Sequence, residues 1–237
     1  MELRKKGKDI LFITNNPSRS PSEYKKKLNT LNIYSKLSEF ITSPMAVNYY
    51  LNKKYKNLGD KSAFIIGSNY LKKEVKKSGI KSVKGKKAYN SDLTIMGGHN
   101  KFNFEEIKTA TISIRNGSDF IATNKDLFYP TENGLSPATG ALLASIEAAS
   151  QSNAVIVGKP EKYIFEILKT HKIKLKRTLL IGDSLNTDIL GGKNAGFKTA
   201  LALTGNTNTN DLKKSEIKPD YVINDLSQLI NQHDPNI

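Results

Sequence analysis

Two aspartates follow an apolar segment in the carboxyl-terminal third of the chain. Asp183 comes directly after Leu-Leu-Ile-Gly at residues 179–182, and Asp188 stands five residues later. An apolar run of this kind is typical of a buried strand, and open α/β sheets bind ligands beyond the carboxyl ends of their strands. Carboxylate oxygens are preferred ligands of Mg²⁺. We therefore predict a metal site in which Asp183 binds the cation and Asp188 orients the surrounding ligands or waters.

Polar residues after two other apolar segments have the chemistry to bind a phosphoryl group. Thr14, Asn15 and Asn16 end the first such segment, and their hydroxyl, amide and backbone N–H groups lie just before a helix start. Lys159 follows another segment and adds a positive charge. Taken singly, each residue fits a surface turn or a helix cap at least as well. Their order and spacing favour one shared site.

Other kinds of site are disfavoured by the sequence. Lys159 is followed by proline and lacks the glycine-rich run of a nucleotide-binding P-loop. The glycines of residues 191–196 do not have the spacing of a dinucleotide fingerprint. The three histidines stand in separate segments, and the chain has no cysteine, so zinc and disulfides are not expected.

Alternating apolar segments and helical patterns position these residues. Such alternation is typical of βαβ units with a largely parallel sheet. We expect strands at 9–14, 63–67, 93–96, 119–123, 154–157, 179–182, 198–203 and 221–223. We expect helices at 1–6, 21–31, 43–55, 104–116, 141–150 and 161–171, another ending at 79, and a last one from 226. Residues 127–140 lack a periodic signal and are predicted to be a linker or a binding loop.

Composition limits the class of protein. The 237 residues are 38% hydrophobic, with no segment of membrane-spanning length and no secretion signal, so we expect a cytoplasmic protein without a membrane partner. The formal charge is +15, but the excess is lysine, and only four residues are arginine. Without arginine forks or interleaved aromatics, specific nucleic-acid binding is not expected. The charge is compatible with steering of a phosphorylated substrate.

Five ordered motifs resemble one known family. The chain is similar to phosphatases of the haloacid dehalogenase (HAD) superfamily, in particular the 4-nitrophenyl phosphatase-like branch, whose cap is a large α/β insertion. The motifs are ILFITNNPSRS at 10–20, DFIATNKD at 119–126, SPATGALLASIEAA at 136–149, VGKP at 157–160 and IGDSLNTDILGGKNAGFKTALALTG at 181–205.

The resemblance implies a fold and an activity. It implies a Rossmann-like core at residues 1–59 and 153–237, with an inserted cap at 60–152. It further implies a Mg²⁺-dependent phosphatase, which is a hydrolase, acting on a small phosphorylated metabolite. A homodimer formed through the cap is an open alternative to a monomer.

The resemblance also assigns roles to individual residues. Thr14 with Asn15 matches the second motif, Lys159 the third, and Asp183 with Asp188 the fourth. Asn16 would contact the substrate, as would Asn124 and Asp126 in the cap, which would help to select the leaving group. Asn186 stands where many relatives carry an acid, which weakens the outer ligand shell.

One family motif has no counterpart in the sequence. The first motif, a central strand followed by Asp-x-Asp, belongs upstream of Met1, so the chain as printed lacks the aspartate nucleophile and is predicted to be inactive. A misplaced start or a fragment is favoured over an evolved pseudoenzyme, because the other motifs are retained. Two alternatives stay open, namely a catalytically inactive phosphate-ligand binder and a basic nucleic-acid-associated protein.

Overall fold

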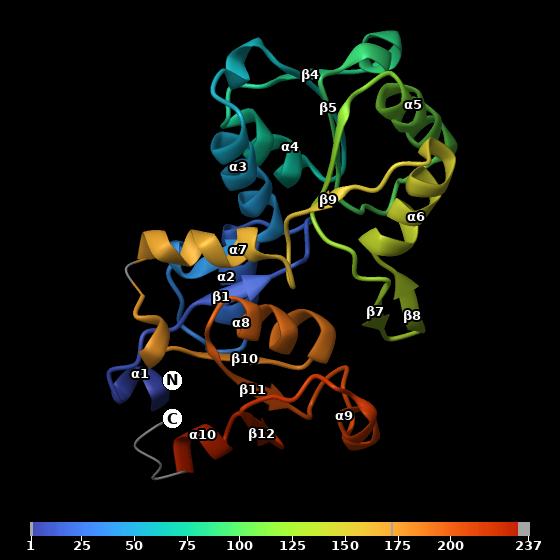
Figure 1. Ribbon diagram of the computed structural model, residues 1–237. Coiled ribbons are helices and arrows are strands. Elements are labelled where there is room, and N and C mark those ends of the chain that lie inside the picture. Colours follow the sequence, from blue (N-terminus) through green and yellow to red (C-terminus); the bar gives the residue numbers. More distant parts are fainter. Residues whose placement is uncertain (1, 172, 232–237) are drawn as a thin grey trace. The chain divides into compact units, whose positions relative to one another are not determined.

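The computed structural model describes residues 2–171 and 173–231, which form two compact units (Figure 1). The large unit is Leu11–Gly158, and the small unit consists of the described residues of Met1–Ile10 and Lys159–Ile237. Every sheet except one hairpin is parallel, which confirms the predicted α/β class with a mainly parallel sheet. The units place residues 11–59 and 153–158 differently from the predicted core and cap, and that core–cap division stays a prediction.

The large unit is built on a five-stranded parallel sheet. Its strand order is β4-β3-β5-β6-β9. The short apolar runs between helices form it, because a strand covered on both faces needs few polar residues. Its strands are β3 (Ser62–Ile66), β4 (Lys81–Val83), β5 (Leu93–Met96), β6 (Asp119–Ala122) and β9 (Val155–Ile156).

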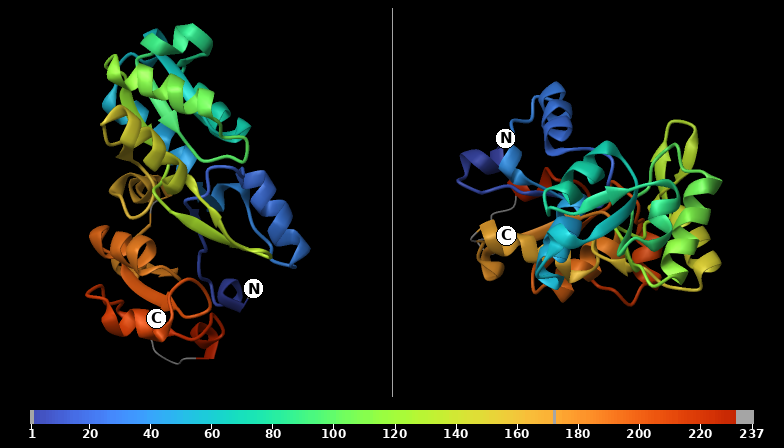
Figure 2. Two further views of the ribbon diagram at one scale, coloured as in Figure 1. Left: turned by 90° about the vertical axis from the view of Figure 1, so that its right-hand side faces the viewer. Right: turned by 90° about the horizontal axis from the view of Figure 1, so that it is seen from above.

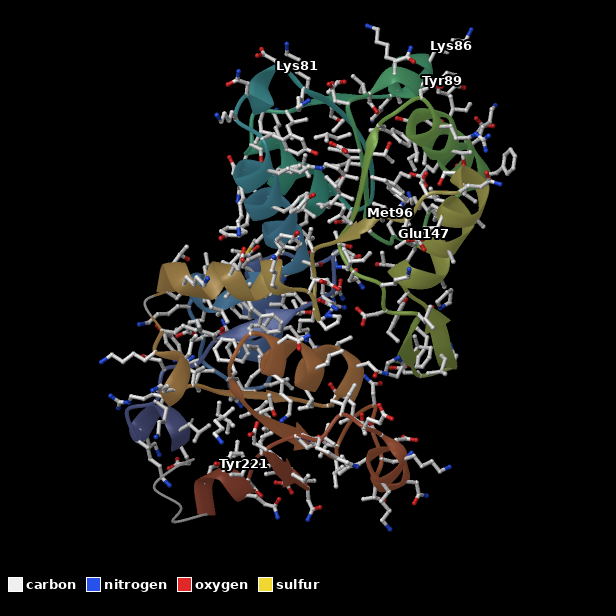
Figure 3. All side chains as sticks on the ribbon, in the orientation of Figure 1. Lys81, Lys86, Tyr89, Met96, Glu147 and Tyr221 are labelled. Atoms are coloured by element: carbon white, nitrogen blue, oxygen red, sulfur yellow. The ribbon has the colours of Figure 1, made fainter. Side chains whose placement is uncertain are left out.

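Two pairs of helices cover the two faces of this sheet (Figures 1 and 2). One face carries α3 (Ser43–Lys54) and α4 (Asn69–Lys76), and the other carries α5 (Phe104–Arg115) and α6 (Thr139–Ser150). Alternate strand residues pack against α5 and α6, among them the fully buried Met96 labelled in Figure 3. This packing fixes the carboxyl ends of β3, β5 and β6, where polar residues begin.

A second, two-stranded parallel sheet belongs to the same unit. It pairs β1 (Phe12–Thr14) with β2 (Phe40–Thr42), whose aromatic rings Phe12 and Phe40 stack with centroids 5.1 Å apart. Helix α2 (Pro21–Thr30) follows β1 and starts with a capping box made by Ser20 and Glu23. The hydrogen bond from the Ser20 hydroxyl lowers the pKa of Glu23. The capping box therefore fixes where the turn after β1 ends.

The stretch predicted to be an aperiodic loop contains a hairpin instead. Strands β7 (Phe128–Thr131) and β8 (Gly134–Pro137) pair antiparallel, so the expectation of no secondary structure at 127–140 is wrong. Nearly every residue of both strands is exposed, and the alternation of apolar and polar residues that reveals a half-buried strand is therefore missing. The Asn-Gly pair at 133–134 was an available turn signal, although the loop itself is Glu132-Asn133 and Gly134, with φ of 109°, already pairs with Thr131.

The small unit contains a three-stranded parallel sheet of order β10-β11-β12. Its strands are β10 (Leu179–Gly182), β11 (Lys198–Ala202) and β12 (Tyr221–Ile223). Its α-helices are α1 (Glu2–Lys5), α7 (Lys162–Glu166), α8 (Leu190–Asn194), α9 (Thr209–Lys214) and α10 (Gln228–Asn231). A π-helical turn at Leu185–Ile189 leads into α8.

Several short elements differ from the sequence-based expectations. Strands β2 and β4 were not predicted, because β2 runs directly into the helix start at Ser43 and β4 is a mostly exposed segment. The helix expected at 161–171 is α7 followed by a 3₁₀ helix at Ile167–His171. Further 3₁₀ helices lie at Leu37–Glu39, Leu58–Asp60, Gly85–Asn90 and Leu175–Arg177. Residue 1 of the first expected helix and residues beyond 231 of the last lie outside the described residues.

Among the described residues, no helix combines the length and the apolar character that crossing a bilayer requires.

Candidate active site

The turn that follows β1 gathers hydrogen-bonding groups at the end of a buried strand. The Thr14 hydroxyl oxygen accepts a hydrogen bond from the backbone N–H of Asn16 (3.2 Å) and lies 3.5 Å from the Tyr24 hydroxyl. The side chain of Asn16 accepts from the backbone N–H of Ser18 (2.8 Å), which closes the turn. A hydroxyl that accepts one bond can still donate its own proton, so Thr14 can serve an anion as a donor.

Asn15 is fixed at both ends. Its side-chain nitrogen donates to Oδ2 of Asp126 (2.9 Å), and its backbone carbonyl accepts from the Ser43 hydroxyl (2.5 Å). Ser43 opens α3 and is fully buried, and Asn15 is itself only 8% exposed. The structure thus brings the predicted residues Asn15 and Asp126 together across 111 positions of the sequence.

The five-stranded sheet holds the same turn from two further strand ends. The Ser68 hydroxyl, after β3, donates to the Pro17 carbonyl (2.8 Å). The Ser18 hydroxyl donates to the carbonyl of Gly98, after β5 (3.3 Å). The remaining predicted substrate residue, Asn124, lies after β6 and donates to Oδ2 of Asp126 (2.6 Å). The carboxyl ends of three strands therefore hold the turn of residues 14–18.

The small unit contains the predicted cationic and acidic residues. Lys159 Nζ forms an ion pair with Oδ1 of Asp188 at 2.6 Å, and the two side chains are 12% and 9% exposed. The other carboxylate oxygen of Asp188 accepts from the backbone N–H of Ser184 (3.2 Å). Gly182 ends β10 and lies against Asp188 so closely that a Cβ atom there would overlap the carboxylate. Asp188 therefore holds Lys159 near the carboxyl end of β10.

The loop after β11 wraps around Asp183. The backbone N–H of Asn206 donates to Oδ2 of Asp183 (2.8 Å), and the N–H of Thr207 donates to its carbonyl oxygen (3.0 Å). A Cβ atom at Gly205 would overlap the Asp183 side chain. Within the described part of the chain, Oδ1 of Asp183 has no hydrogen-bond donor. This oxygen is therefore available to a ligand.

The carboxylate oxygens of the small unit are suitable ligands for a magnesium ion. Mg²⁺ is commonly bound through one or two carboxylates, with waters and substrate oxygens completing its octahedral shell. Asp183 has one carboxylate oxygen without a donor, while both oxygens of Asp188 have donors. Asp183 is thus the better direct ligand. In the described residues, no cluster of three or more acidic or histidine side chains adds to this set.

Sequence reasoning missed three residues that hold the site. Ser43 was predicted only as a helix start, Gly205 only as the last residue of the motif at 181–205, and Asn206 was given no role. A signal existed for the last two, because they follow β11 at the same sheet edge as Asp183. For Ser43 no such signal existed, because the preceding strand β2 was not predicted.

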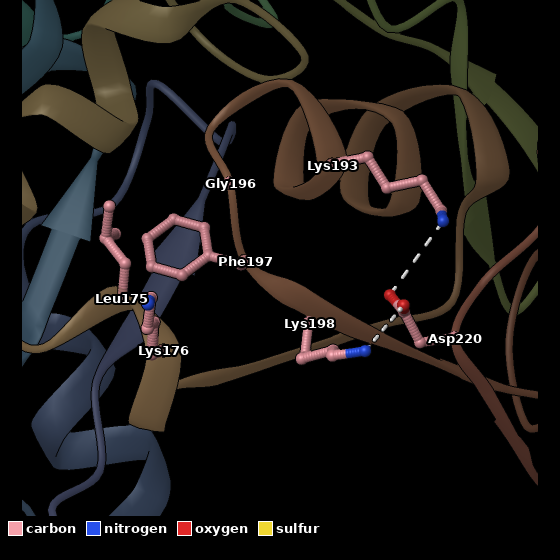
Figure 4. A pocket seen from close by; sticks show the side chains of 7 residues that line it. All are labelled: Leu175, Lys176, Lys193, Gly196, Phe197, Lys198 and Asp220. Carbon is pink, nitrogen blue, oxygen red and sulfur yellow. Dashed lines mark hydrogen bonds and ion pairs between the residues drawn. The ribbon is translucent and has the colours of Figure 1, made fainter.

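A separate pocket of about 630 Å³ lies at the amino ends of the strands of the small unit (Figure 4). It contains none of the predicted site residues. Asp220 lies between Lys193 and Lys198 there, at 3.9 and 3.4 Å. Burial raises the pKa of Asp220, but hydrogen bonds from Thr199 and Lys198 and the positive charge of Lys193 together lower it by more, so the net pKa is below the ordinary value. The pocket is lined by Leu175, Lys176, Lys193, Gly196, Phe197, Lys198 and Asp220.

Comparison with known proteins identifies the family. The profile of haloacid dehalogenase-like hydrolases matches residues 1–81, and that of HAD-hydrolase-like proteins matches residues 156–229. The 5'-nucleotidase YutF of Bacillus subtilis is 31% identical over 229 residues, which cover 96% of this chain and 87% of that protein. The chain belongs to the haloacid dehalogenase-like hydrolases. The resemblance found in the sequence motifs is confirmed.

Solved structures of other HAD hydrolases have the same fold. A double mutant of the thermostable NPPase from Geobacillus stearothermophilus is 34% identical, with a TM-score of 0.84 and coverage of 94% of this chain and 86% of that one. The glycerol phosphate phosphatase of Mycobacterium tuberculosis, solved in complex with magnesium, is 28% identical with a TM-score of 0.89. That alignment covers 96% of this chain and 69% of the other. Phosphatases are thus prominent among the relatives of this HAD hydrolase.

Proposed function

We propose that this HAD hydrolase is a Mg²⁺-dependent phosphatase of small phosphorylated metabolites. The observation that carries the proposal is the Lys159–Asp188 ion pair beside the donor-free carboxylate oxygen of Asp183 in the small unit. A fixed cation and a metal ligand are what transfer of a phosphoryl group requires, since negative charge spreads over its oxygens in the transition state.

Each residue has a separate role in this proposal. Asp183 would hold Mg²⁺, which when bound supplies Lewis-acid stabilisation of the phosphoryl oxygens. Lys159 binds the phosphoryl group through its positive charge, and Asp188 sets the position of its ammonium group. In the large unit, the Thr14 hydroxyl donates to the same kind of anion. The names of the relatives support a phosphomonoester substrate, since one is a nucleotidase and another a glycerol phosphate phosphatase.

The nucleophile is proposed to come from a preceding segment. Among the described residues, β1 pairs only with β2, and β10 pairs only with β11, so each has an edge able to accept another strand. A strand followed by Asp-x-Asp would supply both a sheet partner and the attacking carboxylate. We propose that the printed chain gains activity when extended at its amino end.

Release of phosphate from 4-nitrophenyl phosphate tests this function. The printed chain and a chain extended in frame upstream of Met1 are assayed with Mg²⁺ and with a chelator. We expect Mg²⁺-dependent release by the extended chain and none by the printed one. If neither form is active but a phosphorylated metabolite binds tightly, the proposal fails in favour of a non-catalytic binder. Upstream DNA that encodes no strand with Asp-x-Asp would contradict the proposed nucleophile.

A further inference from the structure

We propose that Asp126 is a positioning residue for the anion-binding turn after β1, and that it acts through the side chain of Asn15. The inference rests on the proposed function, because it deepens the role of that turn as a phosphoryl site. In this role the carboxylate of Asp126 orients Asn15 and does not itself contact a substrate.

The carboxylate of Asp126 is occupied by two amide groups. Its Oδ2 accepts from Nδ2 of Asn15 (2.9 Å) and from Nδ2 of Asn124 (2.6 Å). Both asparagines are buried, at 8% and 3% exposure. An ionised carboxylate can only accept hydrogen bonds, so each amide must turn its NH₂ group toward Asp126. Asp126 therefore selects one of the two orientations available to the Asn15 amide, while the orientation of Asn124 is also set by a hydrogen bond from the Thr123 hydroxyl to its oxygen (2.8 Å).

Asp126 is itself held by the start of α6. Its backbone carbonyl accepts from the N–H of Gly140 in the first turn of that helix (2.7 Å). A Cβ atom at Gly140 would overlap the carbonyl group of Lys125, so helix and loop are in direct backbone contact. The Lys125 side chain adds an ion pair to Glu147 of α6 (3.1 Å). The backbone that carries the carboxylate is thus fixed, which allows the carboxylate to orient Asn15.

Fixing Asn15 fixes the donors on either side of it. With its NH₂ group on Asp126, the side-chain oxygen faces Gly158, where a Cβ atom would lie 2.6 Å from it. The Ser43 hydroxyl holds the carbonyl of the same residue. Thr14 and Asn16 share peptide bonds with Asn15, so their hydroxyl and N–H groups are preorganised as well. Preorganised donors bind an anion without a further loss of conformational freedom.

A direct role in substrate binding fits these contacts less well. A carboxylate placed against a phosphate would repel it, because the two charges have the same sign. The two amide donors already stabilise the negative charge of Asp126. The geometry therefore favours a role in which Asp126 holds Asn15, while the anion is bound by the neighbouring donors of the turn.

A double-mutant cycle with inorganic phosphate as the probe tests the inference on the printed chain. Phosphate affinity is measured by titration calorimetry for wild type, Asp126→Ala, Asn15→Ala and the double variant. The matched control is Asp92→Asn, because Oδ2 of Asp92 also accepts two hydrogen bonds, from the N–H and hydroxyl of Ser62 (both 2.8 Å), in the same unit. The side-chain amide signals in ¹⁵N spectra report the orientation of Asn15 independently of affinity.

We expect Asp126→Ala and Asn15→Ala each to raise the Kd for phosphate about tenfold. The double variant should be no weaker than the single Asn15→Ala variant, because Asp126 acts through that side chain. In Asp126→Ala the Asn15 amide signal should shift, while Asp92→Asn should leave affinity unchanged. A purely structural role would lower the melting temperature without this non-additivity.

Unchanged affinity in Asp126→Ala, or single effects that multiply in the double variant, would overturn the inference. Absence of saturable phosphate binding by the wild-type chain would overturn it too. A Lys159→Ala arm separates this failure from that of the proposed function. If Lys159→Ala weakens phosphate binding and Asp126→Ala does not, only the inference fails. If the Asp126 cycle behaves as expected but the extended chain releases no phosphate, only the proposed phosphatase fails.

Discussion

The ammonium group of Lys159 lies 2.6 Å from a carboxylate oxygen of Asp188, and both side chains are almost withdrawn from water. Asp188 belongs to a π-helical turn, and the ion pair spans 29 residues. Two charges removed from water are tolerated only together, because each alone would carry a large desolvation cost. Loss of either partner should therefore destabilise the small unit, and the intact pair fixes the position of the Lys159 ammonium group.

Replacement of Asp188 by asparagine should destabilise the protein. The substitution keeps the volume but removes one charge of the buried Lys159–Asp188 pair, so we expect a loss of about 3 kcal/mol in the free energy of unfolding. Urea denaturation measures it. The control is Glu2→Gln, which removes an exposed ion pair with Lys5 and should change the free energy of unfolding far less, because solvent screens exposed charges. Equal effects of the two substitutions would contradict a buried, paired charge.

Gly182→Ala should disturb the site without changing any charge. A methyl group at the end of β10 would overlap the Asp188 side chain, so that side chain or the strand must shift. We expect a loss of about 1–3 kcal/mol, as is usual for overpacking. Gly59→Ala is the matched control, since a Cβ atom there meets nothing within 4 Å. Thermal unfolding compares them, and a Gly182→Ala protein as stable as the control would refute the close contact.

The stability contribution of Asp92 should depend on pH. A hydrogen bond from the backbone N–H of Ser62 is the largest influence lowering the pKa of Asp92. Because the folded-state pKa lies below the unfolded value of about 3.9, the contribution is present above that value. It is lost as the pH falls through the folded-state pKa. The difference in unfolding free energy between wild type and Asp92→Asn should therefore shrink from pH 6 toward pH 3, and a constant difference would contradict the depressed pKa.

Much of the architecture could be predicted from the sequence, since the apolar runs that form β3, β5, β6 and β10 are long enough to be recognised. The parallel arrangement followed from their alternation with helices. Strands β2 and β7 were not predicted, because β2 runs directly into the helix start at Ser43 and β7 has no buried face. Local pattern cannot reveal such elements, whose formation depends on neighbours distant in sequence.

The chemical types of the site residues could also be predicted, but their contacts could not. Strand-end positions identified Asp183, Asp188 and Lys159 as candidates. Nothing local indicated that Asp188 would have both carboxylate oxygens occupied while Asp183 would keep one without a donor. Likewise, the contact of Asn15 with Asp126 depends on how two sheets of the large unit pack.

The dependence of turnover on Asp183 tests whether this carboxylate holds the Mg²⁺ of a phosphatase. The rate of phosphate release from 4-nitrophenyl phosphate is measured against Mg²⁺ concentration for the extended chain and its Asp183→Asn variant. Asp211→Asn is the control, since Asp211 only caps α9. We expect Asp183→Asn to lose at least about 100-fold in rate through loss of the metal ligand, and Asp211→Asn to stay near wild type. Near-normal turnover of Asp183→Asn at ordinary Mg²⁺ concentrations would contradict the assignment of Asp183 as the metal ligand.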